Sequence, residues 1–273
     1  MRLAVLADIH GNLPAFEAAI GHASKQGVDR FLIAGDIAVG GPDSAACWHF
    51  AQSLGEPILR GNHERYLAHY GTAKADPLWE TEQFAPLQWA ISQFTEAERQ
   101  AIDQLPLTLR LADAPGVLFV HASARNDKDS IYGHTPASNL PAMFPGIHDS
   151  LVVRAHNHIC QIRIWEHGHI VTSGSVGLPL DSNPSAQYLM LERANGEWHF
   201  EHHSVPYDVG RTLRRFEETG FLREAGPIGQ LLYREVETAS HHMVPFLRAY
   251  RRWAQQDPLS LEQAVARYLS NRR

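Results

Sequence analysis

The sequence predicts an α/β protein in which two packed, mixed β-sheets are flanked by helices and followed by a helical C-terminal extension. Three observations lead to this prediction. Apolar runs alternate with polar loops and helical spacing over residues 1–65, strand patterns recur between residues 107 and 204, and helical spacing returns from residue 208. We therefore expect an α/β domain over residues 1–207 and a helical extension over residues 208–273 that packs on it.

The first 65 residues contain three strand patterns, each followed by a polar loop. The apolar run 3–7 precedes a helix that begins near Pro14, a residue that suits the first turn of a helix. A second apolar run, 31–34, precedes a helix over about residues 44–54, and a third short strand is expected at 57–60. This alternation predicts a parallel sheet with right-handed crossovers, in which ligands bind at the carboxyl ends of the strands.

The middle of the chain mixes helical and strand patterns. Residues 66–104 are expected to be helical, with a capping box at residues 95–98. The runs 107–111 and 117–120 predict paired strands, and residues 122–149 predict a long surface loop with one helical turn.

More strands are predicted after this loop. A strand at 151–154 is followed by two hairpins, with turns near residues 166–168 and 194–196. Because these strands follow one another closely, we expect them to form a second, largely antiparallel sheet.

The extension from residue 208 reads as helical, and three prolines should divide it into three or four short helices. Its 11 arginines and no lysine predict ion-paired helix faces, with a mouth for polyanions as the alternative. Its many large apolar residues must pack on the α/β domain or on a second copy of the chain, which predicts a homo-oligomer through these helices as one arrangement. The prolines are Pro227, Pro245 and Pro258.

The composition narrows the class of protein. The chain has 273 residues, 44% of them hydrophobic, and no apolar run approaches the roughly 18 residues that a membrane-spanning helix needs. The formal net charge of −6 argues against a basic surface for duplex nucleic acid. Cys47 and Cys160 are too few for a disulfide scaffold or a cysteine-only zinc site, so a reducing cytoplasm is expected.

Side chains that commonly ligate metals follow nearly every predicted strand, and the chain contains 17 histidines. One histidine at a strand end is usually structural, but a set that recurs at successive strand ends is not explained in that way. Carboxylate and imidazole donors without thiolate suit Mn²⁺, Fe or Zn²⁺. The residues concerned are Asp8, His10, Asp36, Asn62, His63, His121, His156 and His158.

The same residues fall into five motifs along the chain. The motifs are Asp8-Ile9-His10, Gly35-Asp36, Gly61-Asn62-His63-Glu64, His121 and His156-Asn157-His158. This order resembles the calcineurin-like metallophosphoesterase superfamily, in particular its small bacterial phosphoesterases. The resemblance covers roughly residues 1–210 and implies a metallophosphoesterase-type α/β sandwich. Ala155 and Asn157 stand where the family usually has glycine and threonine, but both histidines of the last motif are present.

The resemblance implies a centre of two divalent metal ions, with Mn²⁺ favoured and Fe, Zn²⁺ or Ni²⁺ as alternatives. It also implies that His63 does not ligate but faces the substrate, where it protonates the leaving oxygen or stabilises developing charge. Asp36 and His63 are therefore the predicted catalytic residues. In this arrangement the first metal is held by Asp8, His10 and His158, the second by Asn62, His121 and His156, and both by Asp36.

The implied reaction is hydrolysis of a phosphate ester by a hydroxide that bridges the two metals. A small phosphodiester or a nucleotide is the favoured substrate, because the sequence predicts no large basic track for duplex nucleic acid. A phosphomonoesterase or protein phosphatase is the alternative, and a metal-binding interaction protein without activity is a further one.

Two more residues are predicted to contact substrate. Arg125 lies in the polar loop after His121, and its guanidinium matches the geometry of a phosphate, although it also fits a solvated loop residue. Asn12 follows the first motif and either positions substrate or caps the helix that begins near Pro14.

Overall fold

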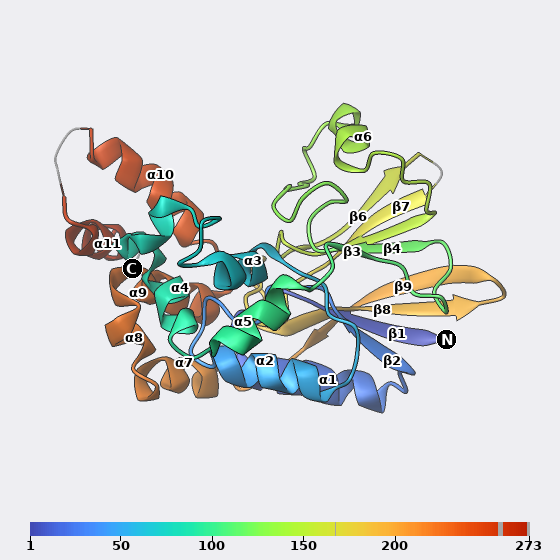
Figure 1. The fold of residues 1–273 in the computed structure, drawn as a ribbon, viewed down its shortest axis with the longest axis horizontal. Coiled ribbons are helices and arrows are strands. Elements are labelled where there is room, and N and C mark those ends of the chain that lie inside the picture. Colours follow the sequence, from blue (N-terminus) through green and yellow to red (C-terminus); the bar gives the residue numbers. More distant parts are fainter. Residues whose placement is uncertain (167, 256–258, 272–273) are drawn as a thin grey trace.

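The computed structural model describes residues 1–166, 168–255 and 259–271 of the chain. Two mixed β-sheets pack against each other, helices cover the outer face of one sheet, and a bundle of C-terminal helices lies at one end (Figure 1). The predicted α/β architecture with two packed mixed sheets and a helical extension is confirmed.

The first sheet has the strand order β2-β1-β8-β9. Its strands are β2 (Arg30–Ile33), β1 (Arg2–Leu6), β8 (Ala186–Ala194) and β9 (Glu197–Val205). β1 is parallel to β2 and antiparallel to β8, so both of its edges are paired. Leu3 and Val5 of β1 point between the sheets, and Ala4 and Leu6 pack under helices, because successive side chains of a strand face opposite sides.

The second sheet has the order β3-β4-β5-β7-β6. Its strands are β3 (Thr108–Leu109), β4 (Val117–Val120), β5 (Leu151–Arg154), β7 (Gly168–Ser173) and β6 (Cys160–Trp165). β4, β5 and β7 are parallel, whereas β3 and β6 are antiparallel edge strands. Between the sheets, Val117 and Phe119 pack with Leu189 and Leu191 of β8.

Two strand predictions were wrong. The hairpin of β8 and β9 joins the first sheet beside β1, so the second sheet is not largely antiparallel. Six successive residues of β8 are buried, and such a strand fits the middle of either sheet, so its own pattern does not reveal its neighbours. Residues 57–60 form no full strand but a single parallel bridge between Ile33 and Ile58.

Helices cover the outer face of the first sheet. α1 (Leu13–Lys25) and α2 (Ser44–Ser53) pack Phe16, Ala19 and Trp48 against it. The region expected to be helical at 66–104 is divided into five shorter pieces, and Thr95 and Glu98 form the predicted capping box. The pieces are α3 (Asn62–His69), η1 (Pro77–Glu80), η2 (Glu82–Phe84), α4 (Ala85–Ile91) and α5 (Glu96–Asp103).

The long loop 122–149 contains a short helical segment at the place of the one predicted helical turn. It consists of η3 (Ala137–Asn139) followed directly by α6 (Leu140–Met143). It is more than a surface loop, because Ile131, Leu140 and Phe144 are buried against the outer face of the second sheet.

The C-terminal extension forms a cap, defined here as helices α7 to α11. Their bounds are α7 (Val209–Glu218), α8 (Phe221–Glu224), α9 (Gly226–Thr238), α10 (Met243–Trp253) and α11 (Leu261–Ser270). The described residues thus form five helices and not three or four, because Gly220, with φ 83°, adds a break that no proline marks. Pro227 and Pro245 lie in first helical turns, and Pro258 lies outside the described residues.

The cap packs on the α/β part of the same chain. Its apolar core includes Trp89 of α4 and Leu178, and α7 is tied to the domain by ion pairs of Arg211 with Glu17 and Arg215 with Asp43. Association through the cap with a second copy stays a prediction. In the described part of the chain, no helix is both long and apolar enough to cross a membrane.

Candidate metal centre

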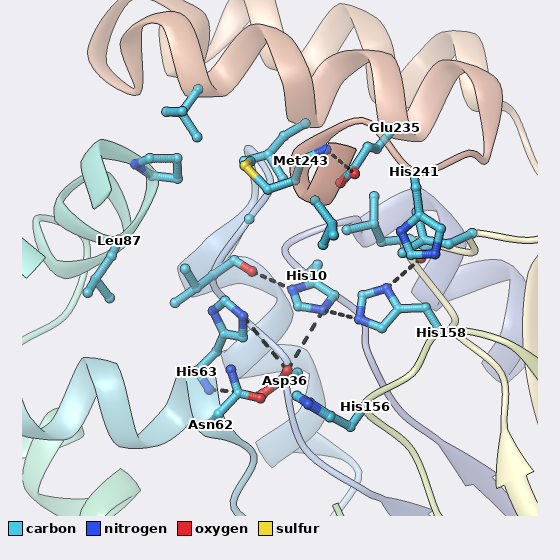
Figure 2. Close-up of a pocket in the computed structure, with 18 of the residues that line it drawn as sticks. His10, Asp36, Asn62, His63, Leu87, His156, His158, Glu235, His241 and Met243 are labelled. Carbon is cyan, nitrogen blue, oxygen red and sulfur yellow. Dashed lines mark hydrogen bonds and ion pairs between the residues drawn. The ribbon is translucent and has the colours of Figure 1, made fainter. Parts of the chain in front are cut away.

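The predicted ligands meet where the carboxyl ends of four strands come together. Asp8 and His10 follow β1, Asp36 follows β2, His121 follows β4, and His156 and His158 follow β5, while Asn62 and His63 begin α3. The two sheets each supply part of the set, so packing one sheet on the other assembles the centre. Figure 2 shows six of these side chains, with Asp36 in their midst.

Asp36 lies at the middle of the cluster. Its Oδ2 is 3.2 Å from Nε2 of His121 and 3.9 Å from Nε2 of both His10 and His63. Its Oδ1 accepts a hydrogen bond of 2.9 Å from the backbone N–H of His63. One oxygen is thus held by the backbone, and the other faces the imidazoles, the placement that a bridging carboxylate needs.

Asp8 and two histidines form a second group beside it. Nε2 of His158 is 3.7 Å from Oδ1 of Asp8 and 3.1 Å from Nε2 of His10. Oδ2 of Asp8 accepts the backbone N–H of His156 at 3.1 Å. Three sets of candidate ligand atoms lie close enough to share an ion, namely those of Asp8, His10 and His158, of Asp36, His121 and His156, and of His10, Asp36 and His63.

Backbone carbonyls orient three of the imidazoles. Nδ1 of His10 bonds to the carbonyl of Val39 at 2.6 Å, and Nδ1 of His158 bonds to that of Leu178 at 2.7 Å. Nδ1 of His121 bonds to the carbonyl of Ala34 at 2.8 Å. A carbonyl only accepts, so each Nδ1 carries a proton and each Nε2 faces the centre, where His10 and His158 present a lone pair.

The arrangement fits bound cations. Oδ1 of Asp8 and Oδ1 of Asn62 are buried without a hydrogen-bond partner, and buried polar atoms are rarely left so. The neutral rings of His10 and His158 would place two lone pairs 3.1 Å apart, which is unfavourable unless a proton or a metal lies between them. A cation at each group would satisfy these atoms together.

The pKa values of the cluster lead to the same conclusion. Burial lowers the pKa of His10 and His158 to about 4 and that of His156 to about 2, so these rings are neutral and free to ligate at neutral pH. Burial raises the pKa of Asp8 to about 8. Burial opposes a charge on His121, but the Asp36 carboxylate raises its pKa to about 10. Protons therefore supply positive charge that bound divalent ions would replace.

Backbone conformation is also unusual here. Ordinary residues avoid a positive φ, at a cost of about 1–3 kcal/mol each, and such strain concentrates at functional sites. Five predicted ligands adopt it, namely Asp8 (53°), His10 (50°), Asp36 (56°), His156 (71°) and His158 (58°).

Glu64 braces the loop that carries Asp36. Its Oε2 accepts the backbone N–H groups of Asp36 at 2.7 Å and Gly61 at 2.8 Å, and its Oε1 accepts that of Ile37 at 2.7 Å. The side chain is 1% exposed, and burial raises its pKa to about 7. Glu64 therefore joins the second and third motifs, a role that its place in the sequence does not reveal.

The fold and the ligand cluster agree with known proteins. A family model for calcineurin-like phosphoesterases matches residues 1–160. The chain belongs to this family. Membership implies phosphoester hydrolysis at a metal centre, typically of two ions, and the clustered carboxylates and imidazoles can supply it.

Three proteins share the sequence pattern or the fold of this calcineurin-like phosphoesterase at 21–22% identity. It is 22% identical over 231 residues to an uncharacterized protein of Methanocaldococcus jannaschii, covering 78% of this chain and 90% of that protein. A metallophosphoesterase from Sphaerobacter thermophilus is 22% identical with a TM-score of 0.69, covering 87% of this chain and 99% of that one. A hypothetical protein from Pyrococcus horikoshii gives 21% identity and a TM-score of 0.68, covering 85% and 97%. These structures show that the fold is shared.

The two predicted substrate-contacting residues are engaged elsewhere. Arg125 forms an ion pair with Asp129, at 2.6 Å between Nε and Oδ2, and does not line the cavity over the metal centre. Asn12 is 1% exposed, and its Oδ1 accepts the N–H of Ala15 and the hydroxyl of Thr212. Asn12 therefore caps α1 and ties α7 to it, and these contacts do not support a substrate-binding role for either residue.

A cavity of about 430 Å³ opens over the centre, within the range of about 300–1,000 Å³ that small-molecule sites occupy. The cap supplies part of its wall, including Glu235, His241 and Met243 (Figure 2). Tyr66 and Phe84 also line it, so the cavity has aromatic walls. The sequence analysis missed these residues, because they lie outside every strand-end motif and reach the cavity only through the packing of α3, η2 and the cap.

Proposed function

We propose that this calcineurin-like phosphoesterase is a phosphodiesterase that acts on small molecules. The observation that carries the proposal is the clustering of candidate ligand atoms of Asp8, Asp36, His10, His121 and His158, with His10, Asp36 and His158 lining one cavity. Two divalent ions held there would supply Lewis-acid charge and an activated water for hydrolysis. Carboxylate and imidazole donors favour Mn²⁺, with Fe, Zn²⁺ or Ni²⁺ as alternatives.

The protein's own residues then divide the work. Asp36 lies between the two ligand groups and, through the N–H of His63 on its Oδ1, fixes the start of α3. His63 lines the cavity with 27% of its side chain exposed, so it can reach a bound ester. Burial lowers its pKa to about 4, so the neutral ring would donate an N–H hydrogen bond to the leaving oxygen. Its ring packs at 5.0 Å from that of His10 and 5.2 Å from that of Tyr66, which restricts its orientation.

Charge favours the diester over the nucleotide polyphosphate that the sequence left open. Among the described residues that line the cavity there is no lysine and no arginine. A diester carries one negative charge, which the metal centre can balance alone, whereas a polyphosphate carries several that would meet no cationic side chain.

The test uses metal-stripped protein with Mn²⁺ added back, assayed on bis-p-nitrophenyl phosphate and p-nitrophenyl phosphate. We expect metal-dependent turnover, faster on the diester, that is lost in Asp36→Asn and weakened in His63→Ala with both metals retained. His199→Ala, an exposed histidine of β9, is the matched control and should behave as wild type. Faster hydrolysis of the monoester would instead identify a phosphomonoesterase or protein phosphatase. Two bound metals without turnover on either ester would contradict the proposed phosphodiesterase activity.

A further inference from the structure

The cavity over the metal centre has one polar side and one apolar side. The metal ligands form its floor, while Phe84 and Leu87 on one flank and Leu232, Met243 and Leu247 of the cap form the opposite walls. Figure 2 shows Leu87 on one side of the centre and Met243 of the cap above it. A substrate whose phosphate lies on the metals must therefore place its other end among these apolar side chains.

Two polar side chains of the cap, Glu235 and His241, also line the cavity, and neither is a lysine or an arginine. Outside the metal centre, Glu235 is the one charged residue that lines the described cavity, and it is 3% exposed. Its Oε1 accepts the backbone N–H groups of His242 at 2.8 Å and Met243 at 2.7 Å, so it holds the junction of α9 and α10 together. Glu235 offers no positive charge to a second phosphate, and no lysine or arginine among the described lining residues stands beside it.

The arginines of the cap do not serve the cavity either. Arg211 and Arg215 pair with Glu17 and Asp43 of the α/β part, and Arg234 pairs with Glu237. None of the described arginines lines the cavity. The cationic extension therefore stabilises packing and offers no anion-binding mouth over the centre.

We propose that the substrate is a phosphodiester with an apolar alkyl or aryl group, which lies between α4 and the cap while the phosphate occupies the metal centre. This inference rests on the proposed function and narrows its substrate class. In the reaction a water oxygen forms a bond to phosphorus, the phosphorus–oxygen bond to one alcohol breaks, and that alcohol leaves with a proton. Met243 and Leu247 are the specificity-determining residues. Both are half-buried in the apolar wall of the cavity, where they would contact the alkyl or aryl group.

The experiment measures kcat/KM with Mn²⁺-loaded full-length protein on p-nitrophenyl alkyl phosphates whose alkyl group runs from methyl through butyl to hexyl. The p-nitrophenolate leaving group is the same throughout, so any trend reports the alkyl group. Complete burial of one methylene corresponds to about a three- to fourfold gain, so we expect kcat/KM to rise by up to that factor per carbon until the cavity is filled.

Met243→Gln replaces a wall residue by a polar one of similar length and should flatten the rise of kcat/KM with alkyl length. Leu269→Gln is the control, since Leu269 packs in the cap core but does not line the cavity. Turnover with a flat or falling trend, or faster hydrolysis of nucleotide polyphosphates, overturns the inference and leaves the hydrolase intact. Absence of turnover on every ester overturns the proposed function and the inference together.

Discussion

Gly61 is the position at which one added methyl group should disable the metal centre. Its φ is −88°, a conformation open to any residue, so the constraint comes from its neighbours alone. A Cβ there would lie 2.1 Å from Oδ1 of Asp36, 2.7 Å from N of Asp36 and 2.8 Å from Oε2 of Glu64. Ordinary contacts begin at 3.4 Å, so the Asp36 oxygen would have to move by roughly 1.3 Å.

Gly61→Ala must therefore displace Asp36 or the start of α3. We expect a loss of about 1–3 kcal/mol in the free energy of unfolding from overpacking. Loss of the hydrogen bond from the backbone N–H of His63 to Oδ1 of Asp36 would add about 1 kcal/mol or more to this loss of stability. A displacement of about 1 Å at a reacting centre can cost about a hundredfold in rate, so turnover should fall at least that far.

Three measurements test this prediction, namely chemical denaturation, the metal content per chain after dialysis and the Mn²⁺-dependent hydrolysis rate. Gly21→Ala is the control, because Gly21 lies within α1 and a Cβ there meets nothing within 4 Å. It should gain about 0.5–1 kcal/mol from helix propensity and keep its metals. A Gly61→Ala protein with two metals per chain, unchanged stability and wild-type turnover would refute the placement of Asp36.

Further predictions concern the brace, the cap and the metals. Glu64→Gln places an amide group against backbone N–H donors, so we expect urea denaturation to show a loss of about 1–3 kcal/mol together with weaker metal retention. Burial raises the pKa of Glu235 from 4.5 to about 7, so the folded chain keeps a proton that the unfolded chain loses, and wild-type stability falls as the pH rises from 4.5 to 7. In denaturation series from pH 4.5 to 7, Glu235→Gln should lack this fall in the free energy of unfolding, which amounts to up to about 3 kcal/mol in the wild type. The same dependence of stability on pH in both proteins would contradict the argument from burial. Wild-type protein with free metal at 100 times its Kd should lose about 5–10 °C in Tm when a chelator removes the metal. The Tm of Asp36→Asn should stay nearly unchanged under the same treatment.

The cap adds part of a cavity wall to a calcineurin-like phosphoesterase core. The family model ends at residue 160, whereas the cap begins at Val209 and still reaches the cavity over the centre. The candidate metal ligands thus come from the core, and part of the cavity wall comes from the extension.

The sequence by itself predicted the candidate ligands and the strand ends that carry them. Asp8, Asp36 and His121 each follow a short apolar run, and the carboxyl ends of parallel strands meet at one edge, so local order along the chain was enough to predict the cluster. The two-sheet class and the helical extension followed from periodicity for the same reason, since hydrophobic spacing is a local property.

Only the tertiary structure decided how these pieces meet. β8 is buried on both faces, so its pattern did not say that it pairs with β1, and Glu64 showed its role only when Asp36 and Gly61 lay within reach of its carboxylate. Asn12 and Arg125 had the right chemistry to bind a phosphate, but Thr212 and Asp129 engage them instead. Such contacts join residues far apart in the chain or depend on how a loop closes, and the type and spacing of residues do not encode which partner is nearest.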